Sequence, residues 1–168
     1  MAQLPCHPRL GRFLVEAAAR DCLERACTWA ALIGERDLLE QPLRKEYSQS
    51  DSIWPSDLSI RERALRRAQD SKFNPAACSA QGISAHAARQ LELTAKLYRD
   101  AARRSGLKSA RGGRDEALGK CLLYAFYDRV AVRRGTGDSL LCAMAGQRRV
   151  ELDRNSCVRQ AQAFVALE

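Results

Sequence analysis

Apolar residues recur along the first part of the chain with the spacing of an α-helix. From residue 8 they fall at i, i+3, i+4, i+7 and i+8, and the same spacing returns from residue 23. A connection of about three residues separates the two runs, and Gly34 follows the second, so the pattern predicts a helical hairpin over 8–34. Its expected core positions are Leu10, Phe13, Leu14, Ala17, Ala18, Leu23, Ala26, Cys27, Ala30 and Ala31.

Two more helices are predicted after a polar stretch. Residues 40–55 are rich in Gln, Ser and Asp and predict a loop, and a helix is expected to begin at Ser56 or Asp57 and to end near residue 70. Residues 71–82 predict a second loop. A long helix follows over 84–105, with Ser84 as its N-cap. The apolar line of this helix is Ala87, Leu91, Ala95, Tyr98 and Ala102.

The hydrophobic period changes towards the C-terminus from that of a helix to that of strands. Gly-containing residues 106–114 predict a linker, and residues 115–127 predict a last helix. Short apolar and polar alternations then predict strands, which together form part of a small antiparallel sheet or barrel. The expected strands are residues 129–133, 140–145, 148–152 and 164–167.

Composition restricts the class of protein. The chain has 168 residues, of which 46% are apolar and 29% are charged, as in ordinary folded domains. No apolar run approaches the ~20 residues that span a bilayer, so no membrane association is expected. Seven cysteines with no CxxC pair indicate neither a disulfide framework nor a zinc site. They favour reduced thiols and a cytoplasmic location.

Positive charge is concentrated in the second half of the chain. Residues 1–70 carry eleven Lys or Arg against eleven Asp or Glu, whereas residues 71–168 carry seventeen against nine. Such a surface attracts polyanions, nucleic acid above all, although a solvated Arg-rich surface without a ligand is the plain alternative. The residues expected to contact nucleic acid are Arg99, Arg103, Arg104, Lys108, Arg111, Arg133, Arg134, Arg148 and Arg149.

Three aromatic residues precede the first predicted strand. Tyr124, Phe126 and Tyr127 stand beside the paired arginines, an arrangement that suits the binding of a single nucleic-acid strand. Their helical spacing favours the other interpretation, in which all three belong to the core.

Two short fragments imitate nucleotide-binding motifs. Gly119-Lys120-Cys121 resembles the end of a P-loop but lacks the upstream glycine-rich turn and the magnesium-binding hydroxyl. Asp115-Glu116-Ala117 resembles a metal-binding box but stands at a helix start, where acidic residues complement the helix dipole. The two histidines, His7 and His86, have no partners for catalysis. We therefore expect no catalytic, cofactor or metal site, and no ATP hydrolysis by this chain alone.

Two longer stretches resemble HrpB-type ATP-dependent helicases of the DEAH-box superfamily. Residues 1–14 read MAQLPCHPRLGRFL and residues 30–37 read AALIGERD, similar to the family's MxxLPxHPRLxRxL and AALxxERD. Residues 122–135 read LLYAFYDRVAVRRG, similar to AxPDR[IV]AxRRG, and the likeness continues to residue 168. Two departures are Tyr127, where the family has proline, and residues 147–149, where it has a Gly-rich turn.

The resemblance implies a mainly α, α+β fold of three parts. Residues 1–39 would be the end of a winged helix with a helical hairpin, 40–114 a ratchet-like helical region, and 115–168 a helix with a partial OB-like β unit. Both RecA-like motor domains are missing from the sequence, so the resemblance implies a fragment. ATP and Mg²⁺ are expected only in a full-length parent.

The function implied is that of an accessory region of the helicase. It would bind single-stranded nucleic acid, RNA ahead of DNA, through residues 89–149, and a separate motor domain is the other partner considered. The alternative is a helical partner-binding module that docks through the apolar faces of residues 8–34, left uncovered by the truncated winged helix. A helix-turn-helix DNA binder built on 8–34 ranks last, because that hairpin is net neutral and rich in alanine.

Overall fold

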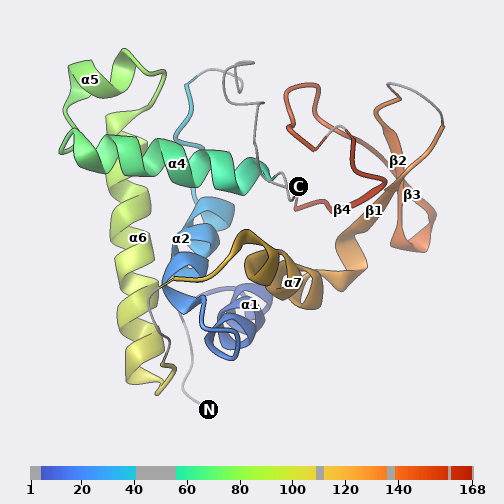
Figure 1. Ribbon diagram of the computed structural model, residues 1–168, viewed down its shortest axis with the longest axis horizontal. Helices are drawn as coiled ribbons and strands as arrows, with labels where there is room; N and C mark the ends of the chain where they lie inside the picture. Colours follow the sequence, from blue (N-terminus) through green and yellow to red (C-terminus); the bar gives the residue numbers. More distant parts are fainter. Residues whose placement is uncertain (1–4, 41–55, 109–111, 136–138, 159, 168) are drawn as a thin grey trace.

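Six α-helices are followed by a four-stranded antiparallel sheet in the described part of a computed structural model of the chain (Figure 1). The structure describes residues 5–40, 56–108, 112–135, 139–158 and 160–167. The mainly helical α+β class is confirmed. The helices are α1 (Pro8–Ala18), α2 (Leu23–Gly34), α4 (Asp57–Asp70), α5 (Pro75–Ser79), α6 (Ala85–Arg104) and α7 (Asp115–Ala125). Two 3₁₀ turns, η1 (Tyr127–Arg129) and η2 (Ala145–Gln147), accompany the strands β1 (Val130–Arg133), β2 (Leu141–Met144), β3 (Arg148–Glu151) and β4 (Ala163–Val165).

Side-chain caps fix where several helices begin. The Ser84 hydroxyl accepts a hydrogen bond from the Ala87 N–H at 3.4 Å, as the sequence predicts. The prediction of a loop over 71–82 is wrong in part, because this segment contains the short helix α5. Asn74 caps α5 by accepting from the Ala77 N–H at 3.1 Å, and Pro75 occupies the first turn, where its missing N–H costs nothing. This Asn-Pro pair was the overlooked helix-start signal.

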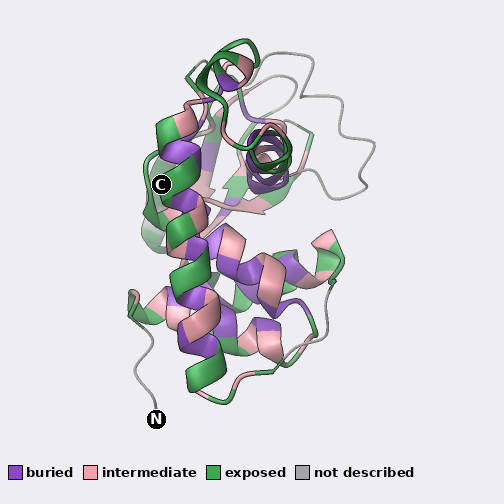
Figure 2. Ribbon diagram, turned by 90° about the vertical axis from the view of Figure 1, so that its left-hand side faces the viewer, coloured by how far each residue is buried: buried purple, intermediate pink, exposed green. Residues whose placement is uncertain are grey.

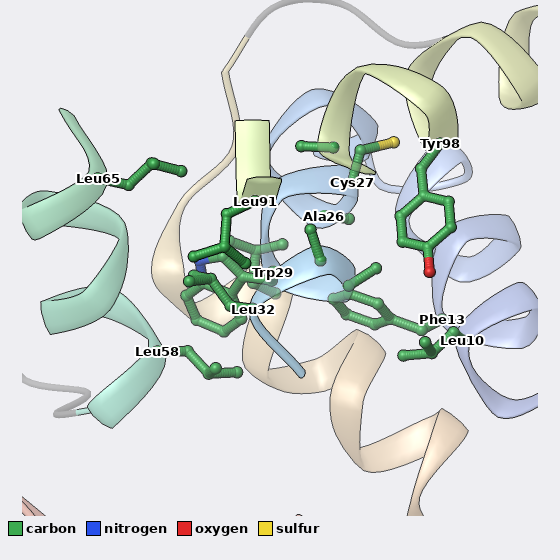
Figure 3. Packing of buried hydrophobic residues seen from close by; sticks show 14 of the residues in the cluster. Leu10, Phe13, Ala26, Cys27, Trp29, Leu32, Leu58, Leu65, Leu91 and Tyr98 are labelled. Atoms are coloured by element: carbon green, nitrogen blue, oxygen red, sulfur yellow. The ribbon is translucent and has the colours of Figure 1, made fainter. Parts of the chain in front are cut away.

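The core is built around α2, which packs against α1, α4 and α6, while α1 also packs against α7. Trp29 and Phe13 are its largest fully buried side chains, and every predicted core position of the hairpin except Ala18 is buried (Figure 3). The predicted apolar line of α6 is buried too, while the rest of that helix carries exposed residues (Figure 2). Cys22 and Cys27 are buried core residues with free thiols, as expected.

Two alternative interpretations of residues 8–34 do not fit this packing. Their apolar faces are not left open for a partner, because α4, α6 and α7 cover them. A helix-turn-helix reader would need a free second helix, but seven residues of α2 are buried. Val15, 50% exposed, is the one large apolar side chain of the described part of this hairpin that faces solvent.

The sheet has the strand order β3-β2-β1-β4, with β3 and β4 at its edges. Paired residues lie on the same face, and Ala131 and Cys142 both belong to a covered face, on which they are 0% and 2% exposed. The other face carries Val132 and Leu141, which are 49% and 58% exposed. We call this second side the open face. All four predicted strands form, within one or two residues of their expected bounds; the OB-like character of the unit stays a prediction.

Gly113 brings the segment before α7 into direct contact with the N-terminus of α2. A Cβ atom at this position would lie 2.3 Å from the Cβ of Cys22, and the backbone φ of +110° favours glycine. No other residue type fits here without displacing either α7 or α2.

We expect Gly113→Ala to lower the free energy of unfolding by about 1–3 kcal/mol, because the new methyl group overlaps Cys22. Urea denaturation of the full chain measures this. Gly119→Ala is the matched control: Gly119 lies within α7 with open space around its Cα. There the substitution is expected to stabilise the chain by about 0.5–1 kcal/mol through helix propensity. Equal effects at the two positions would contradict the packing described for Gly113.

Candidate nucleic-acid interface

The basic residues predicted on and after α6 differ in their availability. Arg99 is only 19% exposed and donates to the Glu92 carboxylate at 2.6 Å, so its charge is already matched within α6. Arg103 is 66% exposed, with carboxylate oxygens of Glu24 and Asp100 at 3.4 and 3.7 Å. Arg104 and Lys108 are also exposed. We call Arg103, Arg104 and Lys108 the α6 basic end.

The arginines of the sheet divide in the same way. Arg133 donates to the backbone carbonyls of Ser139, Val158 and Ala161 at 2.7, 3.2 and 3.3 Å, which fastens the residues before β2 and β4 to β1. Its guanidinium is therefore used within the fold. Three further arginines are exposed, and we call them the sheet arginines: Arg134, Arg148 and Arg149.

The register sets the direction of two of these side chains. Arg149 stands opposite Ala143 and Arg148 opposite Met144 in the β2–β3 pair. Because successive residues of a strand point to opposite faces, Arg149 lies on the open face with Val132, and Arg148 on the other.

The structure does not bring all the predicted residues together. The α6 basic end lies at the lower left in Figure 1, whereas the sheet lies at the upper right, beyond α7. These are two separate basic surfaces, not one continuous patch over residues 89–149. Arg111, which was predicted to contact nucleic acid, lies outside the described residues.

The three aromatic residues before β1 have different environments. Phe126 is 5% exposed and belongs to the core, as its spacing predicts. Tyr124 and Tyr127 are 49% and 66% exposed, so the expectation that they are also core residues is wrong. The Arg20 guanidinium lies 4.9 Å from the centre of the Tyr124 ring, a cation–π contact that joins the turn after α1 to α7.

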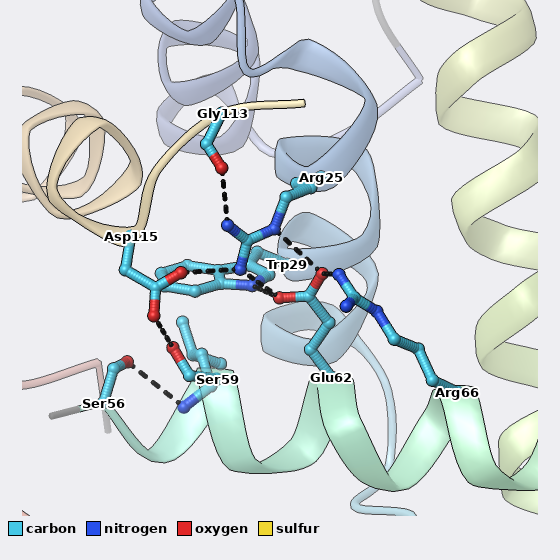
Figure 4. Close-up of polar contacts among 9 residues, drawn as sticks. Arg25, Trp29, Ser56, Ser59, Glu62, Arg66, Gly113 and Asp115 are labelled. Atoms are coloured by element: carbon cyan, nitrogen blue, oxygen red, sulfur yellow. Dashed lines mark hydrogen bonds and ion pairs between the residues drawn. The ribbon is translucent and has the colours of Figure 1, made fainter. Parts of the chain in front are cut away.

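A buried charge cluster at the centre of the molecule was not foreseen from the sequence (Figure 4). Glu62 has only 6% of its side chain exposed and accepts from Arg25 at 2.6 and 3.0 Å. The indole N–H of Trp29 also donates to Glu62, at 2.9 Å. Arg25 reaches onward to Asp115 at 2.8 Å and to the Gly113 carbonyl at 2.7 Å. The cluster thus joins α2, α4 and the start of α7.

Opposing effects set the ionisation of Glu62. Burial raises the pKa of this carboxyl, but hydrogen bonds from Arg25 and Trp29 and the charges of Arg25 and Arg66 outweigh it. The net result is a pKa below the ordinary value for glutamate. The sequence carried one signal for the burial of Glu62. This residue lies four positions after Leu58 and three before Leu65, which places it on the buried face of α4 and not among the exposed arginines.

The fragments that imitate nucleotide motifs have structural roles. Gly119, Lys120 and Cys121 lie inside α7, where their backbone belongs to the helix and cannot cradle a phosphate. Lys120 forms an ion pair with Glu116 at 2.7 Å, and Asp115 holds Arg25. Within the ranges that the structure describes, no group of three or more His, Cys, Asp or Glu side chains gathers for a metal ion. Those same ranges contain no helix with the length and apolarity needed to cross a membrane.

A comparison with known families agrees with this helical arrangement. Residues 7–108 match the family described as helicase associated domain (HA2), ratchet-like. The chain belongs to this family. The HA2 domain indicates the C-terminal region of a DEAH-box helicase, so the chain corresponds to an accessory region of such an enzyme. No match is found among curated proteins. The matched residues run from the first turn of α1 to just past α6; α7 and the sheet follow them.

We expect Glu62→Ala to destabilise the HA2 domain strongly. The substitution removes the acceptor of the Trp29 indole N–H and one acceptor of the partly buried Arg25. We expect the free energy of unfolding to fall by about 2–4 kcal/mol. Chemical denaturation measures it. Glu116→Ala is the control, since the Glu116–Lys120 pair is exposed and its removal should change stability little. A similar cost for both variants would contradict the central role of Glu62.

The pH dependence of stability gives a second test of Glu62. A carboxyl whose pKa is lower in the folded state stabilises the fold fully above its unfolded pKa of about 4.3, and the contribution is lost as pH falls through the folded value. The stability difference between the wild type and Glu62→Gln should thus be constant above about pH 5 and shrink below about 4.3. Denaturation curves over this range test it; a difference that grows in acid would refute the assigned direction.

Proposed function

We propose that the chain is the accessory nucleic-acid-binding region of a HrpB-type DEAH-box helicase. The observation that carries the proposal is the HA2 match over residues 7–108. The motif at 122–135, similar to that of HrpB-type helicases, supports the finer assignment. The ligand is single-stranded nucleic acid, with RNA ahead of DNA, and the chain's role is to hold the strand rather than to carry out chemistry on it.

Binding rests on the sheet arginines in this proposal. Their side chains are exposed, and Arg149 shares the open face with apolar residues, which leaves a strand in contact with both charge and apolar surface. Arg99 and Arg133 are positioning residues, because their guanidinium groups already bind Glu92 and backbone carbonyls. The α6 basic end serves as a second, separate phosphate contact.

Nucleotide chemistry belongs to a motor outside this chain. ATP and Mg²⁺ would act there, since the Lys120 segment is helical and offers no phosphate-binding loop. The contribution of this chain is electrostatic: exposed arginines displace counterions from the phosphates and keep the strand on the protein.

One observation favours docking onto a separate protein as a second function. Leu93 and Leu97 of α6 are 61% and 49% exposed and stand four residues apart, on one face of the helix. A docked partner would cover this pair, and the resulting complex would withstand high salt, unlike binding to nucleic acid.

Salt dependence tests the proposed binding. We expect the full chain to bind a fluorescent oligouridine at low salt, with log affinity falling linearly against log salt concentration. Replacing both Arg148 and Arg149 by alanine should weaken binding and reduce that slope by about 1.4, at about 0.7 for each lost phosphate contact. Fluorescence anisotropy over a salt series measures both.

The matched control replaces Arg36 and Arg63, two exposed arginines of the helical part, and removes the same charge. This double variant should retain the slope of the wild type. Absence of binding at low salt, or an affinity indifferent to salt, would overturn the proposed function.

A further inference from the structure

We infer that Tyr124 and Tyr127 form a base-stacking site, from which the bound strand crosses the open face of the sheet to Arg149. The inference rests on the proposed function and adds a specific site to it. It also narrows the class of ligand: the site requires unpaired bases that can stack on a side chain, and a polyanion without such bases would not use it.

Exposure of apolar side chains is concentrated where α7 leads into the sheet. The described residues include eight large apolar side chains that are exposed. Five of them lie in the consecutive elements α7, η1, β1 and β2: Leu123, Tyr124, Tyr127, Val132 and Leu141. Burying a large apolar side chain is worth about 1.5–3 kcal/mol, so a ligand that covers members of this cluster gains affinity.

The chemistry of this cluster favours bases over a purely apolar ligand. Tyr124 and Tyr127 are the exposed aromatic residues of the described chain, whereas Phe13, Trp29 and Phe126 are buried. A tyrosine ring offers a flat π-face for stacking, while its hydroxyl stays in water. Because every base has a π-face, such a site accepts single strands of different sequence. It does not accept a duplex, whose bases are already stacked.

Arg20 orders the first ring before any ligand arrives. Its guanidinium lies over Tyr124 at 4.9 Å and is held in turn by a hydrogen bond to the Glu16 carboxylate. An ordered ring loses less conformational entropy when a base stacks on it.

Two acidic groups close to the tyrosines form ion pairs in the fold. Glu16 pairs with the Arg20 that contacts Tyr124, and Asp128, next to Tyr127, pairs with Arg9. Repulsion of a phosphate by these two carboxylates is therefore reduced, and the exposed acidic group on the open face is Glu151, two residues from Arg149.

The sheet register supplies the path from the rings to a cation. Val132, Ala143 and Arg149 form one row across β1, β2 and β3 on the open face. Neighbouring strands are about 4.8 Å apart, so the Arg149 backbone lies about 10 Å from Val132. Tyr127 precedes Val132 by five positions, a length of chain that spans at most about 18 Å, so Tyr127 and Arg149 lie within the reach of a short oligonucleotide.

The test compares two probes that carry the same phosphates. One is a labelled oligouridine of about 20 nucleotides, and the other is an abasic oligomer of equal length, which cannot stack. Tyr124→Ala and Tyr127→Ala are measured in the full chain beside Tyr124→Phe and Tyr127→Phe, which retain the rings. Val15→Ala is the control for the loss of exposed apolar surface, since Val15 is 50% exposed on α1 and lies outside the cluster of five exposed residues.

We expect each alanine variant to bind oligouridine about 5- to 100-fold more weakly, the equivalent of about 1–3 kcal/mol per stacked base. The phenylalanine variants and Val15→Ala should bind as the wild type does, and all variants should bind the abasic oligomer equally. Thermal unfolding checks that each variant is folded.

Other outcomes overturn the inference in distinguishable ways. Oligouridine binding that depends on Arg148 and Arg149 but not on the rings removes the stacking site and leaves the proposed function standing. Equal weakening of both probes by the alanine variants shows a general loss of surface and also removes it. If the wild type binds neither probe at low salt, both the site and the proposed function fail.

Discussion

The ionic contact between Arg25 and Glu62 is the interaction on which the arrangement of the whole molecule depends. It joins α2 to α4, and through Asp115 and Gly113 it also fixes the start of α7. α7 leads directly into the sheet through η1, so this contact, together with the packing of α1 on α7 and the Arg9–Asp128 pair, sets the position of the sheet against the bundle. Burial of the carboxylate is tolerated because donors from three side chains surround it.

Much of the fold could be predicted from local sequence signals, and the rest depended on contacts distant in the sequence. Helical spacing located the buried faces of α2 and α6, and alternation located all four strands, because burial imposes these periods directly. Glu62 was missed since its partners, Arg25 and Trp29, lie more than thirty residues away. A lone glutamate among arginines has the same local pattern whether it is solvated or buried.

The candidate site shows the same limit. Exposed arginines were predicted on the basis of charge, but charge alone does not distinguish Arg134, which is exposed, from Arg133, whose guanidinium holds three carbonyls. Helical spacing assigned Tyr124 and Tyr127 to the core together with Phe126. The helix ends at Ala125, so Tyr127 no longer follows the helical period. For Tyr124, the neighbour from the turn after α1 is the Arg20 guanidinium rather than an apolar side chain.

The position of β3 at the edge of the sheet gives its two arginines a second effect. An edge strand leaves backbone N–H and C=O groups without hydrogen-bond partners in the sheet. Such groups readily pair with a strand from another molecule. Charged side chains on an edge strand disfavour such pairing, so Arg148 and Arg149 make β3 a poorer template for another strand, whether or not a ligand is bound.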